Sequence, residues 1–98
     1  MITATDIQNW SKPHQMTLGG KQTRLSNNKI TISIVGGRTG LYGDFVNDFE
    51  VAIIDEETKE FVTRYFVPDL NDDVMAYVPS ENLEQLVNKL MKENFQVL

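Results

Sequence analysis

The 98-residue chain lacks cysteine and contains a single histidine, His14. The absence of cysteine excludes disulfide bonds, thiolate nucleophiles and cysteine-ligated zinc. One imidazole excludes a multi-histidine metal site within one chain. His14 follows a proline in a polar stretch, which favours a surface position over a catalytic one. We therefore expect no catalytic residue, no cofactor and no metal site, and a protein that is not an enzyme.

Long hydrophobic runs are also missing, since no apolar stretch approaches the roughly 18 residues that a membrane-spanning helix needs. Residues 1–6 lack the basic start and the apolar stretch of a signal peptide. The composition, with 41 % apolar and 23 % charged residues, is typical of a globular domain. We expect one cytoplasmic domain over residues 1–98 without membrane contact, in which residues 1–20 form an arm or a covering segment.

The charges are divided unequally between two parts of the chain. Residues 1–40 hold five bases and one acid, a net charge of +4, whereas residues 41–98 hold four bases and thirteen acids, a net charge of −9. Two interpretations stay open. The two parts attract each other within one domain or across a homodimer, or the acidic part forms a face for a basic partner.

One helix is predicted near each end of the chain. The first is short, with Thr3 or Thr5 as its cap and Asp6 in its first turn. The second has Ser80 as its N-cap, and its apolar side chains recur every three or four residues, so that they form one stripe. The stripe comprises Leu83, Leu86, Val87, Leu90 and Met91. The apolar tail, residues 95–98, frays, adds a strand or docks on another subunit.

The strands between these helices are expected to form antiparallel hairpins. Residues 21–26 and 29–35 make the first hairpin around an Asn27-Asn28 turn, which places Leu25 opposite Ile30. The first of these strands should lie at an edge of the sheet, because its basic side chains discourage pairing with another sheet.

A second hairpin is expected further along the chain. Residues 45–54 and 60–67 form its two strands, and the polar residues 55–59 connect them. Residues 74–78 add another short strand. The elements together predict an α+β fold, an antiparallel sheet of four or five strands with the C-terminal amphipathic helix packed on one face and a short N-terminal helix.

The predicted sheet is wider than its helical cover. One helix of about 13 residues is roughly 20 Å long and cannot cover five strands. The opposite face of the sheet is expected to carry apolar side chains, those of Ile54, Val62, Phe66 and Trp10. We expect a homodimer partner or the N-terminal segment to cover this leftover surface.

A glycine-rich loop, residues 36–43, has four glycines in eight positions. Phosphate-binding loops lead from a strand into a helix, whereas here a strand follows, and the Gly-Lys-Ser/Thr sequence is absent. We favour a long connection whose glycines adopt positive φ, with Arg38 and Tyr42 at its tip as candidate partner-binding residues. A nucleotide site or a small enzyme centred on this loop stays an alternative.

Acidic turns supply the remaining candidate partner-binding residues. These are Glu56, Glu57, Asp72 and Asp73. Residues 69–73 match the opening of a calcium-binding loop, but Val74 and Ser80 stand where that motif needs glycine and glutamate. An acidic face of this kind can mimic nucleic acid towards a basic groove of a protein.

The basic N-terminal part offers another alternative, the binding of single-stranded nucleic acid. An aromatic ring can stack on bases while nearby cations pair with phosphates. The candidate residues are Trp10, Lys12, Lys21 and Arg24. The competing role of Trp10 is that of a lid on the small core, which we favour.

Three blocks and the helix that follows them resemble small uncharacterised bacteriophage accessory proteins. The blocks are Gly40-Leu41-Tyr42-Gly43-Asp44, Phe49-Glu50-Val51-Ala52-Ile53 and Asn71-Asp72-Asp73-Val74, and the same order continues into residues 81–92. The resemblance covers residues 34–92 and leaves out the N-terminal segment. It implies an accessory protein that acts on a host or phage protein in the host cytoplasm, and it transfers no catalytic or ligand-binding residue.

Overall fold

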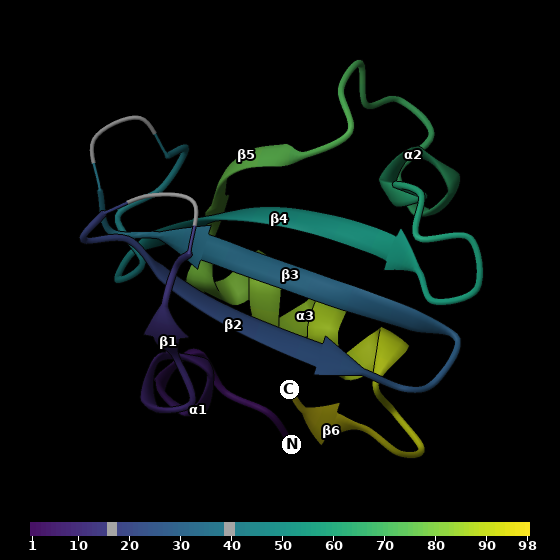
Figure 1. The fold of residues 1–98 in the computed structure, drawn as a ribbon, viewed down its shortest axis with the longest axis horizontal. Helices are drawn as coiled ribbons and strands as arrows, with labels where there is room; N and C mark the ends of the chain where they lie inside the picture. The colour runs from purple at the N-terminus through teal and green to yellow at the C-terminus, as the bar shows by residue number, and fades with distance from the viewer. Residues whose placement is uncertain (16–17, 39–40) are drawn as a thin grey trace.

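The computed structural model describes residues 1–15, 18–38 and 41–98. An antiparallel sheet forms one layer, and helices cover one of its faces (Figure 1). The elements in chain order are α1 (Ala4–Asn9), β1 (Lys12–Pro13), β2 (Lys21–Ser26), β3 (Ile30–Gly36), β4 (Asp48–Asp55), α2 (Thr63–Phe66), β5 (Met75–Pro79), α3 (Ser80–Leu90) and β6 (Gln96–Val97). The strand order is β1-β2-β3-β4-β5, and β6 pairs with β2. The predicted α+β architecture is confirmed.

The β2–β3 hairpin exists, but its register differs from the predicted one. Leu25 pairs with Ile32 rather than with Ile30. The backbone N–H of Asn27 donates to the carbonyl oxygen of Ile30 at 3.2 Å, and the Asn27 side-chain oxygen accepts from two further backbone N–H groups. Asn28 takes the left-handed conformation with φ of 76°. The centre of the turn is therefore one residue later in the chain than predicted, because the side-chain oxygen of Asn27 accepts the N–H groups of Lys29 and Ile30.

Strand β2 is not an edge strand, so that prediction is wrong. Strand β1 pairs with its first two residues and β6 pairs with its last two. The backbone N–H of Leu98 also donates to the carbonyl oxygen of Arg24 at 2.9 Å. The C-terminal tail thus adds a strand, which was one of its three predicted fates.

The second predicted hairpin is wrong in its second strand. Within residues 60–67, Phe61 forms only an isolated bridge with Ile54, and the chain then turns into α2. The buried Thr63 hydroxyl accepts from the Ile53 N–H at 2.9 Å and donates to the Asp73 carbonyl oxygen at 2.6 Å. This hydroxyl joins three segments and diverts the chain from β4, so that β5 pairs there instead.

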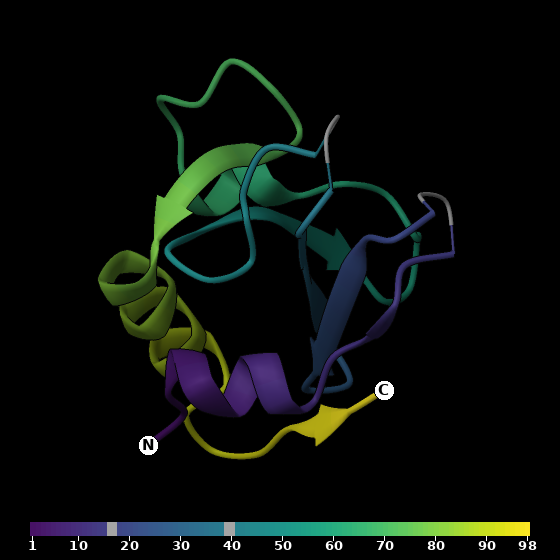
Figure 2. The ribbon, with the colours of Figure 1, turned by 90° about the vertical axis from the view of Figure 1, so that its left-hand side faces the viewer.

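Helix α1 covers the core beside α3. A reciprocal capping box, in which Thr3 and Asp6 each bond the other's backbone N–H, starts the helix. The Asn88 side chain of α3 bonds both the N–H and the carbonyl of Ile2 at 2.8 Å. Ile7 is fully buried. The first ten residues therefore lie against the body of the protein, as Figure 2 shows, rather than forming an arm.

The apolar stripe of α3 faces the sheet, as predicted. Leu83 and Val87 are fully buried, and Leu86 and Leu90 are half-buried against the same cluster. The helix begins at Ser80, whose hydroxyl donates to the carbonyl oxygen of Val46, in the loop before β4, at 3.3 Å and does not cap the helix. The predicted N-cap role is therefore wrong. The core comprises Ile2, Ile7, Leu25, Ile32, Ile34, Phe45, Phe49, Val51, Leu83, Val87 and Met91.

The opposite face of β2, β3 and β4 is built mainly from small or polar side chains. Cross-strand pairing places Arg24, Ser33 and Ala52 in one row on this face. Trp10 was expected there but packs against the core on the helix side. The open face therefore has less apolar surface to cover than the sequence suggested.

Replacement of Leu83 by alanine tests the packing of α3 on the sheet. We expect the free energy of unfolding to fall by about 2–5 kcal/mol, because the change removes a fully buried side chain and leaves a cavity. Chemical denaturation measures it. Gln85→Ala on the exposed face of the same helix is the control and should change stability by no more than about 0.5 kcal/mol. Equal effects of the two changes would contradict this packing.

Candidate partner-binding surfaces

The predicted acidic residues flank α2. The turn that carries Glu56 and Glu57 leads from β4 towards α2, and the loop that carries Asp72 and Asp73 follows it (Figure 1). Arg64 of α2 lies 3.8 Å from the Asp73 carboxylate. Glu57, Asp72 and Asp73 are exposed, so these carboxylates face solvent at one end of the molecule.

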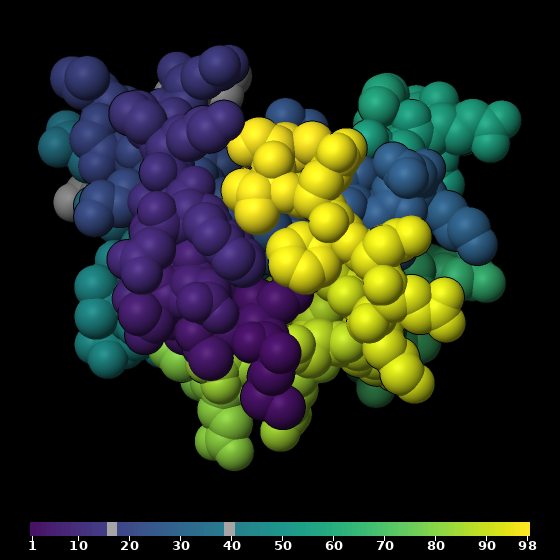
Figure 3. Space-filling model, turned by 90° about the horizontal axis from the view of Figure 1, so that it is seen from below, coloured from purple at the N-terminus to yellow at the C-terminus, as the bar shows by residue number. Residues whose placement is uncertain are grey.

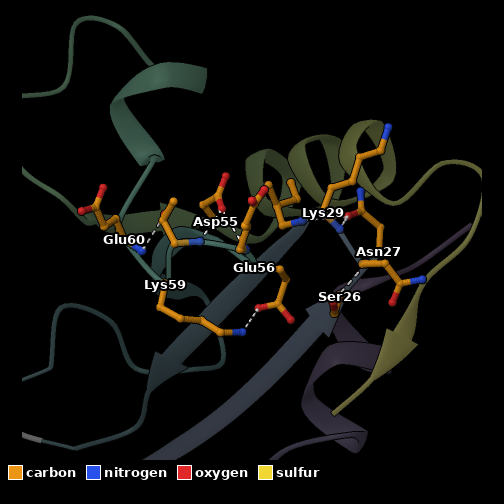
Figure 4. Close-up of polar contacts among 11 residues, drawn as sticks. Ser26, Asn27, Lys29, Asp55, Glu56, Lys59 and Glu60 are labelled. Atoms are coloured by element: carbon orange, nitrogen blue, oxygen red, sulfur yellow. Dashed lines mark hydrogen bonds and ion pairs between the residues drawn. The ribbon is translucent and has the colours of Figure 1, made fainter.

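Glu56 differs from the other three acids because it is half-buried. It forms an ion pair with Lys59 at 3.2 Å, and its backbone N–H donates to the Lys29 carbonyl oxygen (Figure 4). The nearby Thr31 hydroxyl and the Lys59 ammonium lower the pKa of Glu56. Glu56 thus ties the acidic turn to the first hairpin, and it is a weaker candidate for a partner.

Exposed aromatic side chains lie on α2 and just before it, between the two acidic segments of the chain. Phe61, Tyr65 and Phe66 are 52 %, 82 % and 36 % exposed, and the rings of the last two lie 5.3 Å apart. Aromatic residues are enriched in protein interfaces. The alternating pattern of residues 60–67 predicts a strand and therefore does not reveal this surface. We call Glu57, Asp72, Asp73, Phe61, Tyr65 and Phe66 the acidic end.

The ion pairs do not connect the basic and acidic parts of the chain. Within the described ranges the pairs are Lys59–Glu56 and Arg64–Asp73, and both lie inside residues 41–98. Among the described residues, ion pairs with residues 1–40 therefore do not neutralise the net charge of −9 on that part. Attraction across a homodimer and a face for a basic partner both stay open as interpretations of the charge division.

The glycine-rich loop is held by close backbone contacts rather than by positive φ throughout. Gly37 has a φ of 88°. A Cβ on Gly36 would meet the Gly43 carbonyl oxygen at 2.9 Å, and one on Gly43 would meet the Phe49 Cα at 2.7 Å. Residues 39 and 40, part of the predicted loop and of the resemblance, lie outside the described residues.

The two candidates on this loop share Tyr77 as a neighbour. Arg38 lies over Gly19 and lines a hollow of about 420 Å³ together with Asp44, Asp48 and Tyr77. Tyr42 does not line this hollow, but its ring centroid lies 6.0 Å from that of Tyr77. The structure therefore connects the two candidates only through Tyr77.

The segment after the loop is organised by the Asp44 carboxylate. One of its oxygens accepts from the backbone N–H groups of Val46, Asn47 and Asp48 at 2.8, 2.7 and 3.2 Å. These donors, with Asn47 the strongest, lower the pKa of Asp44 from 3.8 to about 2. The charge at this hollow is negative and the nearby donors are occupied, which disfavours a phosphate site.

The four candidates for nucleic-acid binding are only partly brought together. Lys12 and Arg24 line a hollow of about 470 Å³ on the outer side of β2, and Lys21 lies on the same strand opposite Pro13. Trp10 is half-buried, with its ring 5.9 Å from that of Phe95. Figure 3 shows the N-terminal and C-terminal segments side by side on this face. Trp10 thus acts as part of the core cover and is not a free stacking platform.

Among the described residues, no group of three or more histidine, cysteine, aspartate or glutamate side chains could hold a metal ion. No helix in the described ranges is long and apolar enough to span a membrane.

Comparison of the chain with protein-family models, with curated proteins and with solved structures finds no match in any of the three.

Asparagine in place of Asp44 tests the anchoring of the 44–48 turn. The folded-state pKa is lowered from 3.8 to about 2, so the charged carboxylate stabilises the fold above about pH 4, and this stabilisation is lost as the pH falls towards 2. We expect Asp44→Asn to be less stable than the wild type at neutral pH, with the difference shrinking over that acidic window. Denaturation at several pH values measures it.

The control is Asp69→Asn at an exposed position, which should leave the pH profile of stability unchanged. A stability difference between Asp44→Asn and the wild type that stays constant from pH 7 to 2 would contradict the anchoring role.

Proposed function

We propose that this chain is a small non-enzymatic accessory protein that binds a basic macromolecular partner through the acidic end. The observation that carries the proposal is the meeting of exposed carboxylates and exposed aromatic rings around α2. Tyr65 is 82 % exposed there, between the turn of Glu57 and the loop of Asp72. Aromatic side chains supply buried contact area in interfaces, and complementary charge accelerates association and restricts partner choice.

The partner that fits this surface is a protein with a basic groove. A groove that receives nucleic acid carries excess positive charge, so an acidic protein surface can compete for it. Following the resemblance of residues 34–92, we take the chain to be a phage-type protein acting on a host or phage protein in the host cytoplasm. A homodimer belongs to the same proposal, because charges of +4 and −9 on the two parts of the chain complement each other between copies.

Neutralising the acidic end tests the proposal. The variant Glu57→Gln/Asp72→Asn/Asp73→Asn should lose the partner that the wild type captures from a bacterial lysate, because it removes three negative charges and keeps the side-chain shapes. Mass spectrometry identifies the captured protein, and titration calorimetry with the purified partner should show at least tenfold weaker binding. This corresponds to about 1.4 kcal/mol.

A charge-matched control separates local from overall charge. The variant Asp6→Asn/Glu50→Gln/Glu93→Gln also removes three charges, one each from α1, β4 and the segment after α3, and it should retain most of the partner binding. Equal loss of binding in both variants would show a nonspecific charge effect, and undiminished binding in both would contradict the acidic end as the site.

A second candidate function is the binding of single-stranded nucleic acid at the hollow lined by Lys12 and Arg24. The open face of the sheet beside it carries Gln22, Ser33 and Ala52 rather than aromatic rings. Stacking platforms for bases are therefore lacking on these rows, and two cations alone give weak, salt-sensitive binding.

A titration with a labelled single-stranded oligonucleotide at low ionic strength distinguishes the two functions. We expect no saturable change in anisotropy for the wild type. Saturable, salt-sensitive binding that is lost in Lys12→Gln/Arg24→Gln and kept in Lys89→Gln/Lys92→Gln would favour the nucleic-acid function instead.

A further inference from the structure

A groove of about 410 Å³ runs between β5 and α3. Four half-buried apolar side chains line it, one from the loop before β5, two from β5 and one from α3. They are Leu70, Met75, Val78 and Leu86. Tyr77, which is 60 % exposed, forms part of the wall. Flexible apolar side chains such as methionine are common where a surface receives apolar side chains of a partner.

The charge around the groove is of one sign. Both walls come from residues 70–86, and residues 69–86 contain no lysine or arginine. The same stretch holds five acids, which are Asp69, Asp72, Asp73, Glu81 and Glu84. Glu84 bonds the backbone N–H of Ala4 and so faces α1. Asp73 pairs with Arg64 at 3.8 Å. The exposed Asp69, Asp72 and Glu81 remain on the segments that form the groove, and we call these three its acidic rim.

The outer edge of β5 is poorly suited to receive another strand. The N–H of Tyr77 already donates to the Tyr42 carbonyl oxygen at 2.8 Å, and Pro79 has no N–H. Tyr77 also has a φ of 53°, which kinks the strand next to a register shift in the β4–β5 pairing. Two of the five residues of β5 therefore cannot donate a backbone N–H to an added strand, whereas side chains can still enter the groove.

From these observations we propose that the β5–α3 groove binds a short amphipathic helix of the partner, with its apolar side chains between Met75 and Leu86 and its basic side chains against the acidic rim. The inference rests on the proposed function, since it specifies how a basic partner is held beside the acidic end. The proposed occupant of the groove is a protein helix and not an added strand.

The probe is a synthetic peptide with leucines at helical spacing on one face and lysines on the others. A scrambled peptide of the same composition has the same charge but no apolar face. We expect the amphipathic peptide to bind at least tenfold more tightly than the scrambled one, and we expect methyl resonances of Leu70, Val78 and Leu86 to shift on binding. Fluorescence anisotropy and NMR measure these effects.

The matched pair of variants is Leu86→Gln and Leu90→Gln. Both leucines are half-buried on α3 one turn apart, but only Leu86 lines the groove. Leu86→Gln should weaken peptide binding about tenfold, as expected for an interface anchor, and Leu90→Gln should leave it within about twofold. Thermal melts of both variants show whether the fold is retained, and Val78→Thr is the second groove variant if Leu86→Gln unfolds.

Each other outcome overturns the inference. Equal binding of both peptides, lost only in Glu57→Gln/Asp72→Asn/Asp73→Asn, would leave the acidic end as a binding surface but show that the groove takes no helix. Absence of binding by either peptide would reject the groove as a site for this ligand class. Dimers in light scattering that dissociate on Leu86→Gln would show that a second copy occupies the groove.

Discussion

The structure depends on how a single apolar sheet face is covered. An α-helix rises 1.5 Å per residue, so the 11 residues of α3 span about 16 Å, which is less than the width of five strands spaced about 4.8 Å apart. Helix α1 supplies the missing cover, with Ile7 fully buried beside Leu83 and Val87 in the same cluster. The C-terminal strand β6 closes the edge of the sheet that α1 leaves open. Both terminal segments therefore form part of the folded body, one by covering the core and the other by pairing with the sheet.

The packing of the two terminal segments determines which surfaces stay accessible to a partner. Trp10, an attractive base-stacking residue in the sequence, is held between the core and Phe95. The side of the molecule formed by α2, β5 and the loops around them is not covered by either terminus (Figure 1). The exposed aromatic residues Tyr65 and Tyr77 lie on that side. The acidic end and the β5–α3 groove thus share the region that the fold does not use for its own closure.

The sequence predicts elements well where the hydrophobic period is long and unambiguous. The alternation of Ile30, Ile32 and Ile34 identifies β3, and the three-and-four spacing from Leu83 to Met91 identifies α3. The prediction is wrong where hydrogen bonds of one polar side chain fix a backbone conformation that differs from the one indicated by the hydrophobic pattern. The Asn27 amide moves a turn by one residue, and the Thr63 hydroxyl converts an alternating segment into α2. The pattern of apolar and polar residues along the chain does not predict these side-chain hydrogen bonds.

The candidate site likewise has one part that the sequence predicts and one part that it does not. Charge segregation is a property of composition, so the acidic face could be predicted from residues 41–98 alone. The aromatic part of that face could not, because Tyr65 and Phe66 alternate with polar residues as in a half-buried strand. In the sequence Glu56 also looks equivalent to Glu57, and only the structure shows that its carboxylate pairs with Lys59.

The excess of acids over bases also affects stability. Like charges on one side of a small domain repel each other and weaken the compact state, and salt screens this repulsion over about 8–10 Å. A basic partner removes the repulsion when it binds, so part of its binding free energy appears as added stability of this chain. The stretch from Asp69 to Glu84 carries five acids and no base, and it forms both walls of the groove. Partner binding there should therefore stabilise the packing of α3 against β5, the strand at the opposite edge of the sheet from β1 and β6.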